Sequence, residues 1–385
     1  MTMHPETTNR TAFTLFTQAQ DQIRKYNEFK ELGEPAVANE ILASAADSLN
    51  KALAEDPRYL GALYFRGVVD DLRGRAGDAV KDLTRVLEAV EKFVTDYGKC
   101  WPTVEQVKYN LAVAYYHRYG HPNLEKAAGY FQEVIEATKK NQDRRLPLLS
   151  KAGLAQAYAM RMIPKLPTGG TYEEFVAHLR STAVEKDVEE YFELSKAQSD
   201  SALQELKELQ ADPKKRSELG DAANEIGWIA YNARAIALMY YTDFHDDGRM
   251  EKLKGALDAL KEAETRSPEN WSLYCNVGSA NMRLGHWSQV EAEAGGQAQG
   301  VLTAEAKKHF DEAESRLTKV VDVLLPEYGF ALYELGRNCR LMYRFNEART
   351  WLERSGKIDV AQRAVSNERL TLESTRAHLS LTDYP

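Results

Sequence analysis

Two segments with the same residue spacing decide the fold: AADSLNKALAEDP (residues 45–57) and ALDALKEAETRSP (residues 256–268). Each segment places an alanine, a leucine, a second alanine and a proline at successive intervals of four, three and five residues. Residues at intervals of four and three share one face of a helix. A proline cannot donate the next backbone hydrogen bond of a helix. Each segment therefore predicts a helix with a small-large-small face that ends near its proline.

The interval of four and then three residues recurs along the chain. In two of these places a glycine, Gly67 or Gly336, stands twelve residues before the first small residue. A small residue lets a neighbouring helix approach closely, and the larger residue fills the space beside it, so the pattern predicts pairs of packed helices. The further occurrences are Ala79-Leu83-Val86, Ala127-Phe131-Val134, Ala306-Phe310-Ala313 and Ala348-Leu352-Ser355.

This helix-turn-helix unit resembles the tetratricopeptide repeat, whose length is about 34 residues. The resemblance covers roughly two-thirds of the chain, through residues 60–92, 105–138, 271–287 and 333–359. It implies an all-α fold, a tetratricopeptide-like α-solenoid in which antiparallel helix pairs form a right-handed superhelix with a concave groove. Repeats are expected in residues 1–145 and 246–385.

The middle of the chain, residues 146–245, departs from the repeat and is expected to be an insertion of long helices. A proline- and glycine-rich loop over residues 163–171 is followed by a short helix that starts at Thr171. Long helices are predicted over residues 182–210 and 217–244, with a break at ADPKKRSELGD (residues 211–221). A second insert, over residues 290–303, is expected to delay the second helix of a later repeat.

Composition and charge narrow the classes of function. The 385 residues carry a formal net charge of −8, which disfavours nucleic-acid binding. No apolar run approaches 18 residues and no secretory signal is evident, so we expect a cytoplasmic protein without membrane association. The three cysteines are far apart, which favours reduced and mostly buried thiols.

The sequence offers no convincing catalytic set. Phosphate-binding glycine loops, zinc-protease motifs and nucleophile-elbow motifs do not occur. His117 and His121 are four residues apart, but Gly120 and Pro122 predict that His121 lies in a turn, away from a shared helical face. We therefore predict a non-enzymatic protein with no cofactor and no bound metal.

The resemblance also indicates which side chains line the groove. The lysine and asparagine that clamp a chaperone's terminal carboxylate in some members are replaced here, for example by Tyr64 with Val68 and by Tyr109 with Val113. Tyrosine and arginine are common at binding hot spots, although aromatic residues at helical spacing also serve as packing residues. The predicted partner-binding residues are Tyr64, Tyr109, Asn110, Tyr116, Asn276, Arg283, Tyr333, Arg337 and Arg340.

These observations favour a scaffold, an adaptor or an inhibitory regulatory subunit that holds a partner protein or peptide. The stretch 337–363 is locally basic, so an acidic partner segment could dock there, or the charges could form a solvated helix face. A bacterial receptor of the tetratricopeptide type that senses a peptide or another ligand is the alternative. The chain is expected to be a monomer or a weak homodimer.

Overall fold

The computed structural model describes residues 7–98, 100–163, 177, 181–326, 328–358, 368 and 371–372. Within these ranges the chain is helical and contains no β-strand. Among the described helices, none combines the length and the apolar character that crossing a membrane requires. The chain divides into two compact units, the first Met1–Ala157 with Ser201–Ile226 and the second Tyr158–Asp200 with Gly227–Pro385. The division at residues 145 and 245 stays a prediction.

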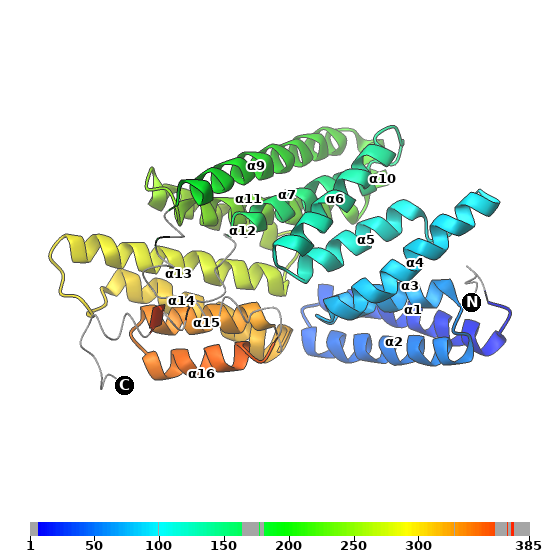
Figure 1. Cartoon of the computed structure of the whole chain (residues 1–385), viewed down its shortest axis with the longest axis horizontal. Helices are drawn as coiled ribbons and strands as arrows, with labels where there is room; N and C mark the ends of the chain where they lie inside the picture. Colours follow the sequence, from blue (N-terminus) through cyan, green and yellow to red (C-terminus); the bar gives the residue numbers. More distant parts are fainter. Residues whose placement is uncertain are drawn as a thin grey trace. The chain divides into compact units, whose positions relative to one another are not determined.

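Consecutive antiparallel helix pairs build the N-terminal part of the first unit (Figure 1). In the first pair, the helix that begins at Arg10 starts beside the end of the helix that finishes at Glu55. A hydrogen bond of 3.1 Å from Asn9 Nδ2 to the carbonyl oxygen of Glu55 shows this. The pairs are α1 (Arg10–Glu31) with α2 (Pro35–Glu55), α3 (Leu60–Leu72) with α4 (Ala76–Tyr97), and α5 (Val104–His117) with α6 (His121–Thr138).

Longer helices follow, and the boundaries of the two units fall inside three of them. These helices are α7 (Arg145–Arg161), α9 (Thr182–Ala211), the short α10 (Pro213–Leu219) and α11 (Ala222–Thr242). In the first unit, Leu148, Leu206 and Ile226 bring α7, α9 and α11 together in one core. The expected loop and short helix over residues 164–176 lie outside the described residues.

The break predicted at residues 211–221 is only partly correct, because this segment contains α10. Asp212 starts the helix, since its side chain accepts hydrogen bonds from the backbone N–H groups of Lys214 and Lys215. Pro213 follows in the first turn, where its missing N–H costs nothing. Proline and glycine here delimit a helix of seven residues and do not form a loop.

The second unit ends in further helix pairs: α12 (Arg249–Glu264), α13 (Trp271–Ala294), α14 (Ala304–Lys319), the π-helical turn η1 (Val320–Leu324), α15 (Gly329–Leu341) and α16 (Phe345–Ser355). The predicted insert at residues 290–303 starts inside α13 and leaves a loop over residues 295–303. Gln289 anchors this loop, because its side chain donates to the Val301 carbonyl at 2.9 Å and accepts from the Thr303 N–H at 3.0 Å.

A glycine of one helix closely approaches a leucine of the next in two pairs of the second unit, and the spacing predicted a packing role for the leucine Leu352. A methyl group added to Gly336 would lie 2.7 Å from Cγ of Leu352, and one added to Gly278 would lie 2.7 Å from Cγ of Leu317. Both leucines are completely buried. The helices of a pair are therefore closer at these points than any larger residue on the first helix allows, and the prediction of an all-α fold of packed helix pairs is confirmed.

We expect Gly336→Ala to lower the free energy of unfolding of the second unit by about 1–3 kcal/mol, because the new methyl group overpacks a buried contact. Gly255→Ala is the matched control, since its methyl group would lie 3.8 Å from Leu238 in ordinary contact. The control should stabilise α12 by about 0.5–1 kcal/mol through helix propensity. Chemical denaturation followed by circular dichroism measures both, and equal effects of the two substitutions would contradict the close-contact interpretation.

Candidate functional site

Three of the predicted partner-binding residues meet in the second unit. Arg283 comes from α13, and Arg337 and Arg340 come from one face of α15, where residues three apart are neighbours. Each pairs with a carboxylate from another position in the chain. We call this set the arginine cluster, and it consists of Arg283, Arg337, Arg340, Asp243, Glu334 and Glu368.

Arg283 forms the innermost ion pair of the cluster. Its guanidinium donates to both carboxylate oxygens of Asp243 at the end of α11, with distances of 2.8–3.2 Å. The guanidinium also lies over the ring of Tyr240, 4.9 Å from its centre. Burial opposes the charge of Arg283, whose side chain is 4% exposed, but Asp243 more than offsets this and raises the pKa of the arginine. The pair is therefore charged and fixed.

Arg337 and Arg340 together hold a carboxylate from beyond the last repeat. Arg340 Nε donates to Glu368, and Nε of Arg337 lies 3.7 Å from the other oxygen of the same carboxylate. Arg337 also donates to Glu334 on its own helix at 3.0 Å. The side chains of Arg337 and Arg340 are 22% and 12% exposed, so this end of the cluster is open to solvent in part.

The electrostatic potential of the cluster acts on a neighbouring histidine. Burial, followed by the positive charges of Arg340 and Arg337, lowers the pKa of His286 to about 4. The imidazole is therefore neutral at physiological pH. Among the described residues, Ser279 Oγ and Glu334 Oε2 have no hydrogen-bond partner although both residues are almost completely buried. The two arginines thus oppose protonation of His286, and the site also contains buried polar atoms without a hydrogen-bond partner.

The remaining predicted residues of the second unit lie around the cluster and make fewer polar contacts. Tyr333 lies beside Arg337, whose guanidinium is 5.7 Å from the centre of the ring, and burial raises the pKa of its hydroxyl. Asn276 donates to Asn232 of α11 at 2.8 Å, which ties α13 to α11. Tyr333 therefore borders the arginines, and Asn276 holds the supporting helices together.

The predicted residues of the first unit connect successive first helices. Asn110 Nδ2 donates to the hydroxyl of Tyr64 at 2.6 Å, and seven residues further along both helices His117 Nδ1 lies 3.0 Å from both oxygens of Asp71. Tyr64 is 9% exposed and its pKa rises through burial to about 12. These groups already satisfy one another between neighbouring repeats.

The two other tyrosines of the first unit lie on the same helix, α5. Tyr116 is 6% exposed and lies beside His117 and Tyr119. Tyr109 packs against Phe131 of α6, with 5.9 Å between the ring centres. Both tyrosines therefore contribute to packing, and a partner-binding role for the residues of the first unit stays a prediction.

The sequence reasoning missed the carboxylates of the arginine cluster. Glu334 could have been found, because it lies three residues before Arg337 on the same helix. Asp243 is 40 residues from Arg283, on a helix that does not match the repeat, and Glu368 is 28 residues from Arg340. No local spacing connects these partners, so only the packing of the helices reveals them.

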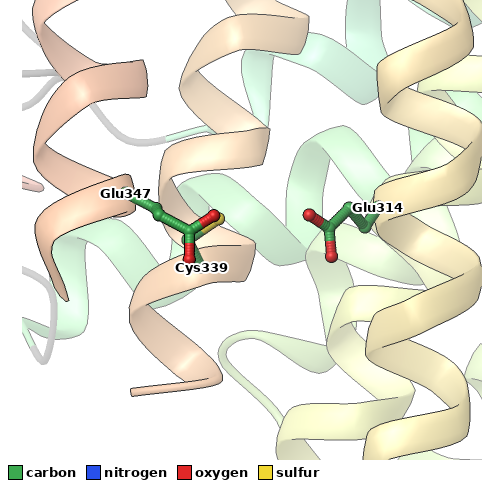
Figure 2. Close-up of side chains that lie close together, drawn as sticks. All are labelled: Glu314, Cys339 and Glu347. Carbon is green, nitrogen blue, oxygen red and sulfur yellow. The ribbon is translucent and has the colours of Figure 1, made fainter. Parts of the chain in front are cut away.

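Glu314, Cys339 and Glu347 also bring possible metal ligands together, with their donor atoms within 4.8 Å of one another (Figure 2). They come from α14, α15 and α16. The guanidinium of Arg344 donates to Glu314 at 2.6 Å and to Glu347 at 2.7 Å. Burial raises the pKa of Cys339 to about 12, which keeps the thiol protonated. One arginine therefore already pairs with both carboxylates and balances one of their two negative charges, so the three side chains form an ion-pair network.

Two other features bear on possible chemistry. His121 is the first residue of α6, so the prediction that it lies in a turn is wrong; Pro122 fits in the first turn of that helix. A shallow hollow of about 720 Å³ lies beside α14, where the exposed Lys307, Lys308 and Asp311 line it with His309. Its charged groups point to solvent and form no converging set.

Comparison with known proteins gives structural similarities only. No protein-family model matches the sequence, and no curated protein matches it. Among solved structures, a tetratricopeptide repeat protein from Parabacteroides merdae is 13% identical, with a TM-score of 0.41 over 92% of this chain and 98% of that chain. The TPR2AB domain of yeast Sti1, solved as a pHSP90 complex, is 14% identical, with a TM-score of 0.25 over 92% and 97% of the two chains.

Yeast Tom70 is 15% identical, with a TM-score of 0.18 over 96% of this chain and 97% of that chain. The chain's own geometry carries the assignment of the fold. Antiparallel helix pairs recur, and the contacts of Gly278 and Gly336 repeat the same close approach of a first helix to a second. The described part of the chain is an all-α array of recurring antiparallel helix pairs.

We expect the stability of the protein to fall between pH 6.5 and pH 4 in part because of His286. Its pKa is lowered in the folded state, so its contribution is complete above pH 6.5 and is lost as the pH falls through about 4. His286→Gln should reduce this loss by up to about 3 kcal/mol. Urea denaturation at several pH values measures how the free energy of unfolding changes with pH. The same pH dependence in the variant and the natural protein would contradict the role assigned to His286.

His117 shows the opposite pH dependence, because its pKa is raised in the folded state where that of His286 is lowered. Burial opposes its charge, but Asp71 outweighs burial and raises the pKa of His117 above its ordinary value. Its stabilising contribution is complete below about pH 6.5 and is lost as the pH rises through the folded-state pKa. The deficit of His117→Gln relative to the natural protein should therefore be greatest in mild acid, and a deficit that grows with rising pH would refute this sign.

Proposed function

We propose that this protein is a non-enzymatic scaffold or inhibitory subunit that binds an acidic segment of a partner protein through the arginine cluster. The observation that carries this proposal is the engagement of one carboxylate by Arg337 and Arg340, whose side chains remain partly exposed. Arginine binds carboxylates with directional, charge-assisted hydrogen bonds. A partly exposed arginine pair is therefore suited to recognise an aspartate or glutamate of another chain.

The surroundings of the arginine pair support this role. Tyr333 lies against Arg337 and supplies an aromatic surface beside the charge, and residues of this kind dominate the binding energy at protein interfaces. The Arg283–Asp243 ion pair fixes α13 against α11, so that the arginines of α15 face a rigid neighbour. Preorganisation of this kind reduces the entropy cost of binding. A cytoplasmic location remains part of the same proposal.

Affinity purification from native cell extract tests the proposal. We expect the natural protein to retain a partner that the double variant Arg337→Glu/Arg340→Glu loses by about tenfold or more, because like charges then meet across the interface. The control is Lys308→Glu/Arg354→Glu, which changes the net charge equally at exposed positions of α14 and α16.

The control variant should retain the partner. Quantitative mass spectrometry compares the three samples, and circular dichroism confirms that each variant is folded. Equal recovery of the partner by both variants would refute the role of the arginine cluster. Recovery of no partner by the natural protein would refute the scaffold function itself.

A further inference from the structure

Two residues near the C-terminus contact the arginine cluster and the core beside it. Glu368 and Leu372 are both in helical conformation and are four residues apart in the sequence. The carboxylate of Glu368 accepts a hydrogen bond from Arg340 and lies 3.7 Å from Nε of Arg337, and Glu368 is 6% exposed. Leu372 is 1% exposed and packs against α15 and α16 in the core that Cys339, Phe345 and Ala348 form.

The two contacts have the chemistry of a ligand bound by a receptor. One acidic group enters a pair of arginines, and one aliphatic group four residues later enters an apolar pocket, which is how an amphipathic helix is recognised in a groove. Both contacts are made with α15 and α16, and the contact between Arg340 and Glu368 crosses a sequence separation of 28 residues. Nothing in the repeat pattern itself requires a glutamate at this point.

We propose that Glu368 and Leu372 act as an internal ligand, and that the partner supplies a helix with an acidic residue four positions before a leucine. This inference rests on the proposed function and specifies its ligand and its regulation. The partner helix must displace the two residues, so the chain inhibits its own binding site until a stronger competitor arrives.

The balance of charges explains why a partner's carboxylate must replace Glu368 and cannot bind in addition to it. The arginine cluster holds three guanidinium groups and three carboxylates, of which Glu368 is the one that follows α16 in the sequence. Removing it would leave Arg340 without its ion-pair partner in a largely desolvated position, which is costly. A competing helix restores the balance only if it brings a carboxylate, and a neutral or basic helix is excluded.

The apolar contact adds a second requirement. Cys339, Phe345 and Ala348 are fully buried with Leu372 in place, and its departure would expose them. A competitor needs an aliphatic side chain at the same distance from its carboxylate to cover this surface. The spacing of four residues therefore distinguishes a specific helix from an acidic segment of any conformation.

A labelled synthetic peptide of residues 363–377, RAVSNERLTLESTRA, tests the inference directly against the full-length chain. Fluorescence polarisation compares its binding to the natural protein and to the variant Glu368→Ala/Leu372→Ala, in which the internal ligand is disabled. We expect the peptide to bind the variant about tenfold or more tightly than the natural protein, because a tethered competitor acts at a high effective concentration. The exposed Glu353→Ala serves as the control variant and should behave as the natural protein does.

The peptide itself provides the specificity control. A peptide with Glu368→Lys should not bind the opened variant, and a peptide with Leu372→Ala should bind it more weakly. Equal binding of the natural peptide to the opened variant and to the natural protein would overturn the inference. So would equal binding of the peptide with Glu368→Lys. If circular dichroism shows that the double variant is unfolded, the single variant Glu368→Gln is used in its place. Peptide binding to this variant is then compared with binding to the natural protein, with the same expected result.

The outcome separates this inference from the proposed function. A cellular partner that depends on Arg337 and Arg340 but is recovered equally by the natural protein and the opened variant would leave the proposed function standing and refute the internal ligand. Peptide binding to the opened variant without any cellular partner would support the internal ligand and refute the scaffold role.

Discussion

The close approach of a glycine on one helix to a leucine on the next is the contact on which the rest of this structure depends. At Gly67, as at Gly336, an added methyl group would lie within 2.8 Å of the facing leucine. Interiors are packed too densely to absorb such a change. Because this face of each first helix packs against its own partner helix, the polar side chains on its other faces remain for contacts with other parts of the chain.

Each unit uses these other faces differently. In the first unit, Asn110 and His117 of α5 bind Tyr64 and Asp71 of α3, so hydrogen bonds between first helices consume the polar groups. In the second unit, Arg283 likewise forms an ion pair with Asp243. Arg337 and Arg340 instead pair with Glu368, which follows the last described helix pair. Among the described residues, Glu368 is the residue beyond α16 that pairs with the arginines of α15. The polar face of α15 is therefore the part of the array that is most available for another ligand.

The sequence predicted the helix pairs well and the site only in part. Intervals of four and three residues report burial on one helical face, which is why the burial of Leu83 and Leu352 followed from the spacing. The resemblance to the repeat proposed Arg283, Arg337 and Arg340 as groove residues, and they lie on α13 and α15. It does not report which residue of another helix stands opposite, so Asp243 and Glu368 were missed. The break predicted at residues 211–221 was only partly correct, because local sequence does not show whether Pro213 ends one helix or begins the next.

The burial of so many charges in one place argues for recognition over stability. A buried ion pair recovers little more than the cost of removing its charges from water, and apolar residues of similar size stabilise a core at least as well. Arg283 and Asp243 fix two helices, which a pair of leucines could also do. Arg340 and Glu368 do something that leucines cannot, because they make the contact selective for a carboxylate. Removing Glu368 would leave Arg340 without an ion-pair partner, which is costly. Replacing Glu368 with another carboxylate would restore the pair. A selective binding site requires both properties.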